Sequence, residues 1–240
     1  MNSIFDIFKI GIGPSSSHTM GPMTVCNKIL DRINQHQLIN KITAIDIELF
    51  GSLAYTGKAH GTDKALIAGL YGFTPDSVTS QDIKSLYDDV NKNKKITIAD
   101  SISIPFNLDK NIIYNIKTSP SYHSNALTIY VYTYNQELLF KKTYYSIGGG
   151  AIVSDNKIQL KSSLVDYPYI YDTASDLFRL CEKENLNIWD IVLINEKYLS
   201  SEDEINLQID KIWSVMNESI QKGIATKGVL EGGLKVERRA

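Results

Sequence analysis

The sequence has few of the residues that bridge chains or bind metals, because it contains two cysteines and four histidines in 240 residues. Cys26 and Cys181 have neither the spacing of a metal site nor that of a redox motif. Two thiols in a chain of this length are typical of a reducing compartment. We therefore expect a cytoplasmic protein with no metal-ligating residues of its own.

Long apolar runs and an excess of one charge are also lacking. The opening residues MNSIFDIFKIGIG are interrupted by Asp6 and Lys9, unlike a signal peptide, and no later segment resembles a membrane span. The 25 basic and 27 acidic residues nearly balance, and no basic stripe stands out. We therefore expect neither nucleic acid nor a membrane as a partner.

The remaining composition, 43% apolar and 22% charged, is typical of a globular chain with a sizeable core. Apolar residues three and four positions apart predict helices, and alternation or β-branched runs predict strands. We expect Pro22 in the first turn of one helix, Thr62 or Asp63 as the N-cap of the next, and Thr79 as that of a third. The expected helices are 22–36, 62–72, 80–90, 172–199 and 205–224, and the expected strands are 44–50, 111–117, 126–134 and 137–147.

The pattern predicts an α+β fold, an antiparallel sheet with flanking helices, followed by further helices. We place a first domain at residues 1–165 and the start of a second at 166–240, where the composition becomes helical. The last three strands are expected to be consecutive antiparallel neighbours. His123, before the second of them, should then lie beside the glycines Gly148 to Gly150 that follow the third.

Three of the four histidines occur in polar, glycine-flanked loops. They are His18 in SSSHT, His60 in KAHGTD and His123 in SYHSN, whereas His36 lies near a helix end and is expected to be exposed. A loop histidine is often only structural, but three with Gly, Ser or Thr neighbours favour a shared site. We expect these three rings to lie on one face of the first domain.

The first of these loops is GIGPSSSHTMGP, residues 11–22. A serine replaces the third glycine of a dinucleotide-binding fingerprint, and Pro14 removes a backbone donor. A plain linker is disfavoured because apolar segments flank the stretch. Two interpretations stay open: an anion-binding loop at a helix N-terminus, or a serine or threonine that only caps the helix. The hydroxyls available to an anion are those of Ser15, Ser16, Ser17 and Thr19.

The second loop places His60 just before another helix start. Asp63 could orient the His60 ring and fix its tautomer, or it could be an N-capping residue. The glycines at 148–150 could let a ligand approach the backbone, or they could form a bend between strands.

Four segments of the chain together resemble one known family: SIFDIFKIGIGPSSSHTMGPM, GSLAYTGKAHGTDKALIAGL, SIGGGAIV and EGGLKVERRA. They are similar to the N-terminal portion of the bacterial L-serine dehydratases (L-serine ammonia-lyases) of the iron–sulfur type, and the resemblance covers essentially the whole chain. Single-chain members are about twice as long and hold a 4Fe-4S cluster on cysteines of a later domain. This chain has His123-Ser124-Asn125 where the family usually has a His-Pro-Asn segment.

The resemblance implies a fold like the allosteric substrate-binding domain of one class of phosphoglycerate dehydrogenases. It also implies deamination of L-serine to pyruvate and ammonia, a C-terminal cluster domain as partner, a homodimer, and a fragment that is inactive alone and binds no cluster. We expect His60 to be the base, with His18 as its rival. The expected substrate-binding residues are Ser15, Ser16, Ser17, Thr19, Thr62, Asp63, His123, Asn125, Gly148 and Gly149. The alternatives are a regulatory module that binds serine or an anion without catalysis, and a structural dimerisation domain.

Overall fold

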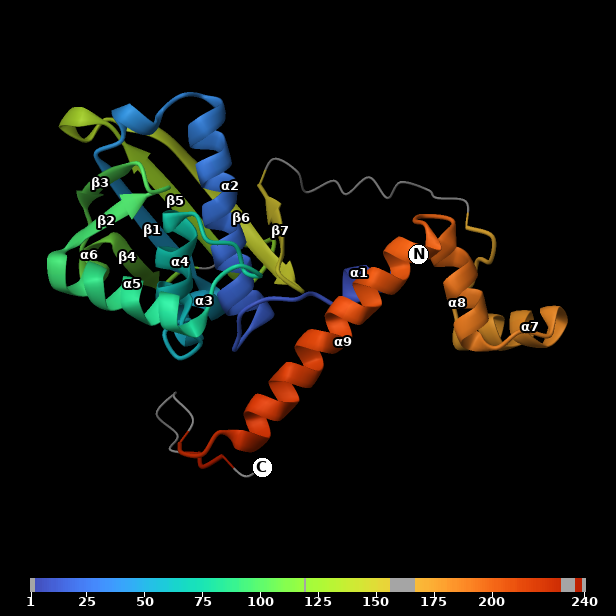
Figure 1. Ribbon diagram of the computed structural model, residues 1–240. Coiled ribbons are helices and arrows are strands. Elements are labelled where there is room, and N and C mark those ends of the chain that lie inside the picture. Colours follow the sequence, from blue (N-terminus) through green and yellow to red (C-terminus); the bar gives the residue numbers. More distant parts are fainter. Residues whose placement is uncertain (1–2, 119, 156–166, 230–235, 239–240) are drawn as a thin grey trace. The chain divides into compact units, whose positions relative to one another are not determined.

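The computed structural model describes residues 3–118, 120–155, 167–229 and 236–238 (Figure 1). The chain folds as two compact units. Of the described residues, the sheet unit comprises 10–118 and 120–155, and the helical unit comprises 3–9, 167–229 and 236–238. The expected boundary between residues 165 and 166 lies outside the described residues. No local pattern in the sequence predicts that residues 3–9 join the helical unit.

The sheet unit is built on a five-stranded sheet in the order β4-β1-β5-β6-β7. β1 pairs in parallel with β4, and all other neighbours in this sheet are antiparallel. A separate hairpin joins β2 and β3. The fold is therefore α+β, as expected. The strands are β1 (Ala44–Phe50), β2 (Lys95–Ile98), β3 (Ile102–Pro105), β4 (Ile112–Asn115), β5 (Asn125–Tyr132), β6 (Leu138–Gly148) and β7 (Ala151–Ser154).

Helices cover this sheet and share its core. α4 (Thr62–Tyr71) packs between α2 (Gly21–Gln35) and α5 (Ser80–Asn93), as Figure 1 shows. Apolar side chains of α2 and the alternate side chains of β1 belong to one buried core, as the helical spacing and the strand alternation predicted; they are Cys26, Ile29, Leu30, Ile33, Ile45, Ile47 and Leu49. Thr79 caps α5 through a capping box, as expected. The short elements are η1 (Ser16–Met20), η2 (Ile39–Lys41), α3 (Gly51–Thr56), α6 (Leu108–Asn111) and η3 (Tyr134–Gln136).

The order of the strands differs from the expected meander. β4 does not pair with β5, because β1 lies between them. The two strands still run in opposite directions, since β4 is parallel and β5 antiparallel to β1. The end of β4, the start of β5 and the end of β6 therefore lie at the same end of the sheet.

Two local expectations are also corrected. The segment after β1, expected to be a turn, contains the short helix α3. Neither Thr62 nor Asp63 caps α4, because the N-cap is Gly61, whose φ of 65° is a left-handed conformation that favours glycine.

The helical unit contains α1 (Ile4–Ile7), α7 (Ala174–Glu184), α8 (Ile188–Lys197) and α9 (Glu202–Ala225). The segment expected to be helical at 172–199 forms two helices, since Asn185 adopts a left-handed conformation that ends α7. Ser3 and the backbone N–H of Ile4 both donate to the carboxylate of Glu196 in α8, at 2.8 Å each. No helix in the described part of the chain is both long and apolar enough to cross a membrane.

Candidate active site

His18 lies in η1, the single π-helical turn that leads into α2. The hydroxyl of Ser15 accepts from the backbone N–H of His18 at 3.2 Å, so Ser15 caps this turn. The His18 ring is buried and bonded on both sides, through Nδ1 to Ser17 Oγ at 2.8 Å and through Nε2 to Ser52 Oγ at 3.0 Å. Burial first, and then the nearby His60, lower the pKa of His18 below 6.5, although an interaction with Ser52 opposes this shift. The ring is therefore neutral at neutral pH.

The His60 ring lies beside that of His18, with 4.8 Å between the ring centroids and 44° between the planes. His60 Nδ1 is 2.9 Å from the backbone carbonyl oxygen of Thr56. A carbonyl oxygen can only accept, so Nδ1 carries the hydrogen. In the neutral ring the lone pair is then on Nε2, which is the arrangement that a general base requires.

Two threonine hydroxyls join the loops that carry these histidines. Thr19 Oγ1 donates to the carbonyl oxygen of His60 at 2.9 Å, and Thr62 Oγ1 donates to the carbonyl oxygen of His18 at 2.6 Å. Both side chains are buried. Neither hydroxyl could donate to a substrate, the role expected of them, without breaking its bond inside the protein.

Asp63 bonds to Lys64 and Tyr87 rather than to His60. It is buried, its Oδ1 accepts from the backbone N–H of Lys64 at 2.9 Å, and its Oδ2 accepts from the Tyr87 hydroxyl at 3.2 Å. Burial and then the charge of Asp63 raise the pKa of Tyr87 to about 12. The structure therefore shows Asp63 neither orienting the His60 ring nor capping α4; its side-chain hydrogen bonds are with Lys64 of α4 and Tyr87 of α5.

The third histidine loop meets the end of β6, as expected from the strand directions. His123 Nδ1 accepts from the backbone N–H of Asn125, whose side chain donates to the carbonyl oxygen of Ser146 at 3.3 Å. Beyond Ser146, Gly148 and Gly149 have φ values of 101° and 58° and open space where a side chain would be. This backbone is thus open to a ligand.

The turn that carries His18 connects these loops. The backbone N–H of Ser52, whose hydroxyl bonds the His18 ring, donates to the carbonyl oxygen of Ser124 beside His123. A side chain added at Gly150 would meet Met20 of η1 at 3.2 Å. The loops that carry His18, His60 and His123 are therefore linked at one end of the sheet, the first two by a ring contact and the third through Ser52 and Ser124.

Three residues of this cluster were not singled out from the sequence: Ser52, Thr56 and Ser146. Ser52 and Thr56 lie in the segment that was expected to be a turn, where side chains have no defined direction. Helix α3 directs Ser52 toward His18 and the Thr56 carbonyl toward His60. The sequence signal that could have predicted helix α3 is the helix-forming run SLAY, directly before the loop that carries His60.

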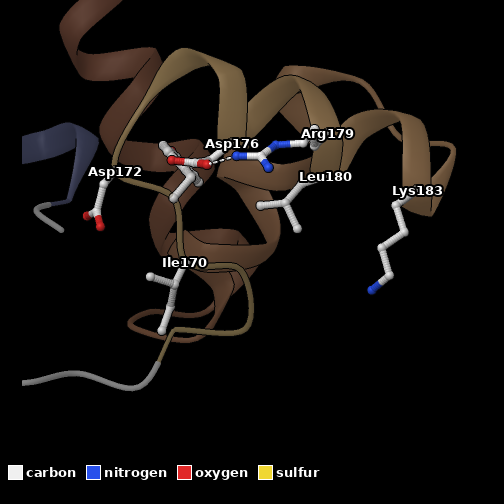
Figure 2. Close-up of a pocket in the computed structure, with 7 residues that line it drawn as sticks. Ile170, Asp172, Asp176, Arg179, Leu180 and Lys183 are labelled. Atoms are coloured by element: carbon white, nitrogen blue, oxygen red, sulfur yellow. Dashed lines mark hydrogen bonds and ion pairs between the residues drawn. The ribbon is translucent and has the colours of Figure 1, made fainter.

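The open cavities of the helical unit contain none of the expected site residues. One, of about 460 Å³, lies between α7 and the segment before it (Figure 2), and an ion pair between Arg179 and Asp176 forms part of its wall. A second, of about 280 Å³, is an apolar groove between α1 and α9. Within the described ranges, no three His, Cys, Asp or Glu side chains gather as a metal site would require.

Comparison with known proteins shows which family the chain belongs to. The family model of the serine dehydratase beta chain matches residues 3–157. L-serine dehydratase TdcG of Escherichia coli (strain K12) is 40% identical over 242 residues, which are 100% of this chain and 53% of that protein. The L-serine dehydratases of Streptomyces coelicolor and Haemophilus influenzae are each 35% identical, over 99% and 100% of this chain and 53% of their own length. The chain spans about half the length of the curated relatives it matches, and it belongs to the serine dehydratase beta chain family.

Proposed function

We propose that this chain is the part of an L-serine ammonia-lyase that removes the α-proton of L-serine, in an enzyme that releases pyruvate and ammonia. The names of its relatives support the reaction. The observation that carries the proposal is the pair of adjacent histidine rings, in which the His60 ring offers an Nε2 lone pair beside a His18 ring that is kept neutral.

The geometry suits proton abstraction in two ways. When His60 Nε2 takes the proton, the Nδ1–H bond to the Thr56 carbonyl stabilises the imidazolium that forms, because the bond becomes charge-assisted. The adjacent His18 ring carries no charge at neutral pH and therefore does not oppose the positive charge that forms on the His60 ring, 4.8 Å away. His60 is thus the better candidate base, and His18 is a neutral neighbour whose nitrogens are both engaged.

The substrate is expected to lie between this pair and the end of β6. Its carboxylate would meet the hydroxyls of Ser15, Ser16 and Ser17 near the start of α2, where backbone N–H groups favour an anion. The remaining expected contacts are His123, Asn125 and the exposed backbone of Gly148 and Gly149. Loss of the α-proton and of the β-hydroxyl as water gives 2-aminoacrylate, which tautomerises and hydrolyses to pyruvate and ammonia.

The iron–sulfur cluster of the resembling family does not fit this chain's own residues. A cubane normally needs three or four thiolates, and the chain has two cysteines in total. Cys26 lies in the core of the sheet unit, where burial raises the pKa of its thiol, and Cys181 belongs to the helical unit. We propose that the polypeptide corresponding to the second half of the relatives holds the cluster.

The same second half is the partner that we propose for the helical unit. α9 presents apolar side chains three and four residues apart, all at least 43% exposed. Such an exposed apolar stripe on an amphipathic helix is typical of a surface that packs against another polypeptide. They are Ile209, Trp213, Met216, Ile220 and Ile224. We further propose, as the resemblance implies, that the complete enzyme is a cytoplasmic homodimer.

Substitution of the base tests the proposed function. In the complete enzyme, His60→Ala should lower kcat by about 10²–10⁴-fold, the usual contribution of a general base. The control is His36→Ala, which removes an exposed ring at the end of α2 and should leave kcat unchanged. If His18→Ala abolishes activity and His60→Ala does not, the two roles are exchanged. If neither variant affects kcat but serine binds the isolated chain in calorimetry, the chain is a regulatory module instead.

A further inference from the structure

The two histidine loops are joined by a reciprocal pair of hydrogen bonds. Thr19, next to His18, donates to the carbonyl oxygen of His60, and Thr62, two residues after His60, donates to the carbonyl oxygen of His18. Each loop therefore supplies one donor and one acceptor to the other. The two threonines are only 2% and 0% exposed, so water cannot readily replace either bond.

These bonds act on the backbone of the residues that carry the rings. The His60 loop is otherwise held by local turns, in which the His60 N–H donates to Thr56 and Gly57 within its own segment. Turns of this kind fix the shape of a loop but not its position relative to a second loop. The hydrogen bonds from Thr19 and Thr62 supply that position, across separations of 41 and 44 residues.

We propose that Thr19 and Thr62 are positioning residues that hold the His18 and His60 rings side by side, and that the His60 base depends on this reciprocal bridge. The catalytic part of this proposal rests on the proposed function, whereas the structural part does not. Neither threonine touches the reacting atoms in this role, and each acts through a histidine carbonyl. This differs from the substrate-donor role that the sequence suggested for both.

The structural part is tested by NMR on the 240-residue chain, which has only four histidine ring signals to resolve. Thr62→Val keeps the side-chain shape and removes the donor. We expect the contact between the His18 and His60 ring protons to weaken, and the His18 titration midpoint to rise toward 6.5 as the ring becomes less buried; His60 is the titratable group that faces it. Thr62→Ser keeps the donor and should restore both signals.

A matched control removes another buried hydroxyl, far from the histidines in the sequence. Thr128 is buried in β5 and shares a hydrogen bond of 2.8 Å with Thr143 of β6. Thr128→Val should leave the His18 and His60 signals at their wild-type positions. If Thr62→Val does not fold by circular dichroism, Thr19→Val and Thr62→Ser decide the question. If every folded variant that lacks one of the two threonine hydroxyls keeps the wild-type His18 and His60 signals, the proposed bridge is refuted.

The catalytic part is tested in the complete enzyme. A misplacement of about 1 Å can lower a rate by about 10²-fold, so Thr62→Val should lower kcat by roughly that factor with little change in KM. Thr62→Ser should recover most of the loss. If the ring signals move but kcat does not, the bridge exists and its catalytic importance is refuted. If His60→Ala itself leaves kcat unchanged, the proposed function fails while the NMR result stands.

Discussion

Gly21 is the position where one added methyl group should disturb the site most directly. It is the first residue of α2, and its φ and ψ of −56° are ordinary helical values. The backbone would therefore accept alanine, and the cost of the substitution comes from contacts of the added methyl group with neighbouring atoms. Its Cβ would lie 2.1 Å from Ser146 Oγ and 2.8 Å from Ser146 Cβ. Ser146 is fully buried near the end of β6, so it cannot swing away into solvent.

The magnitude follows from this geometry. Overpacking by a methyl group costs about 1–3 kcal/mol, and the higher helix propensity of alanine offsets up to about 1 kcal/mol of it. A net loss of about 1–2 kcal/mol lowers the Tm of a domain of 150–250 residues by roughly 2–8 °C. Gly21→Ala should therefore lower the midpoint of thermal unfolding by an amount that calorimetry or circular dichroism resolves.

A second substitution separates this contact from other causes. Ser146→Gly removes both atoms that Gly21→Ala would meet, and it removes a buried hydroxyl that has no hydrogen-bond partner among the described residues. Such a hydroxyl costs about 1–3 kcal/mol, which offsets part of the flexibility that glycine adds. The double variant should be more stable than the sum of the single effects predicts. Strict additivity, or an unchanged Tm for Gly21→Ala, would refute the close approach of α2 to β6.

Three further outcomes are expected. The pKa of His18 is lowered in the folded chain, so the unfolded chain binds more protons below pH 6.5, and the free energy of unfolding measured in urea should fall as the pH drops through that value. His18→Gln should make this free energy less dependent on pH, and the same pH dependence in the variant and the wild type would contradict the prediction. Thr79→Ala should cost about 1 kcal/mol, because it removes the capping box of α5, and an unchanged urea midpoint would contradict this. Trp213→Asp should weaken binding of the separately expressed second half of a relative, while Tyr134→Asp, at 76% exposure in the sheet unit, should not; equal binding would reject the α9 surface.

The sequence by itself determined the features that depend on neighbouring residues. The spacing of apolar residues located α2 and α9, and alternation located β1 and its buried face, because each pattern follows from the period of its backbone. Thr79 revealed the start of α5, since a capping box is closed within four residues. The histidine loops were recognised for the same reason, as short polar segments between apolar ones.

Only the tertiary structure decided what depends on partners far along the chain. The place of β4 beside β1 rather than β5 is set by pairing across 65 residues, as in Ile47 with Ile112, and no local pattern encodes it. The direction of a side chain is decided in the same way. Asp63 could orient a histidine or cap a helix by sequence, yet it bonds Tyr87, and Thr62 bonds the carbonyl of a residue 44 positions earlier. Sequence patterns report which residues are buried, whereas the choice of hydrogen-bond partner requires the folded geometry.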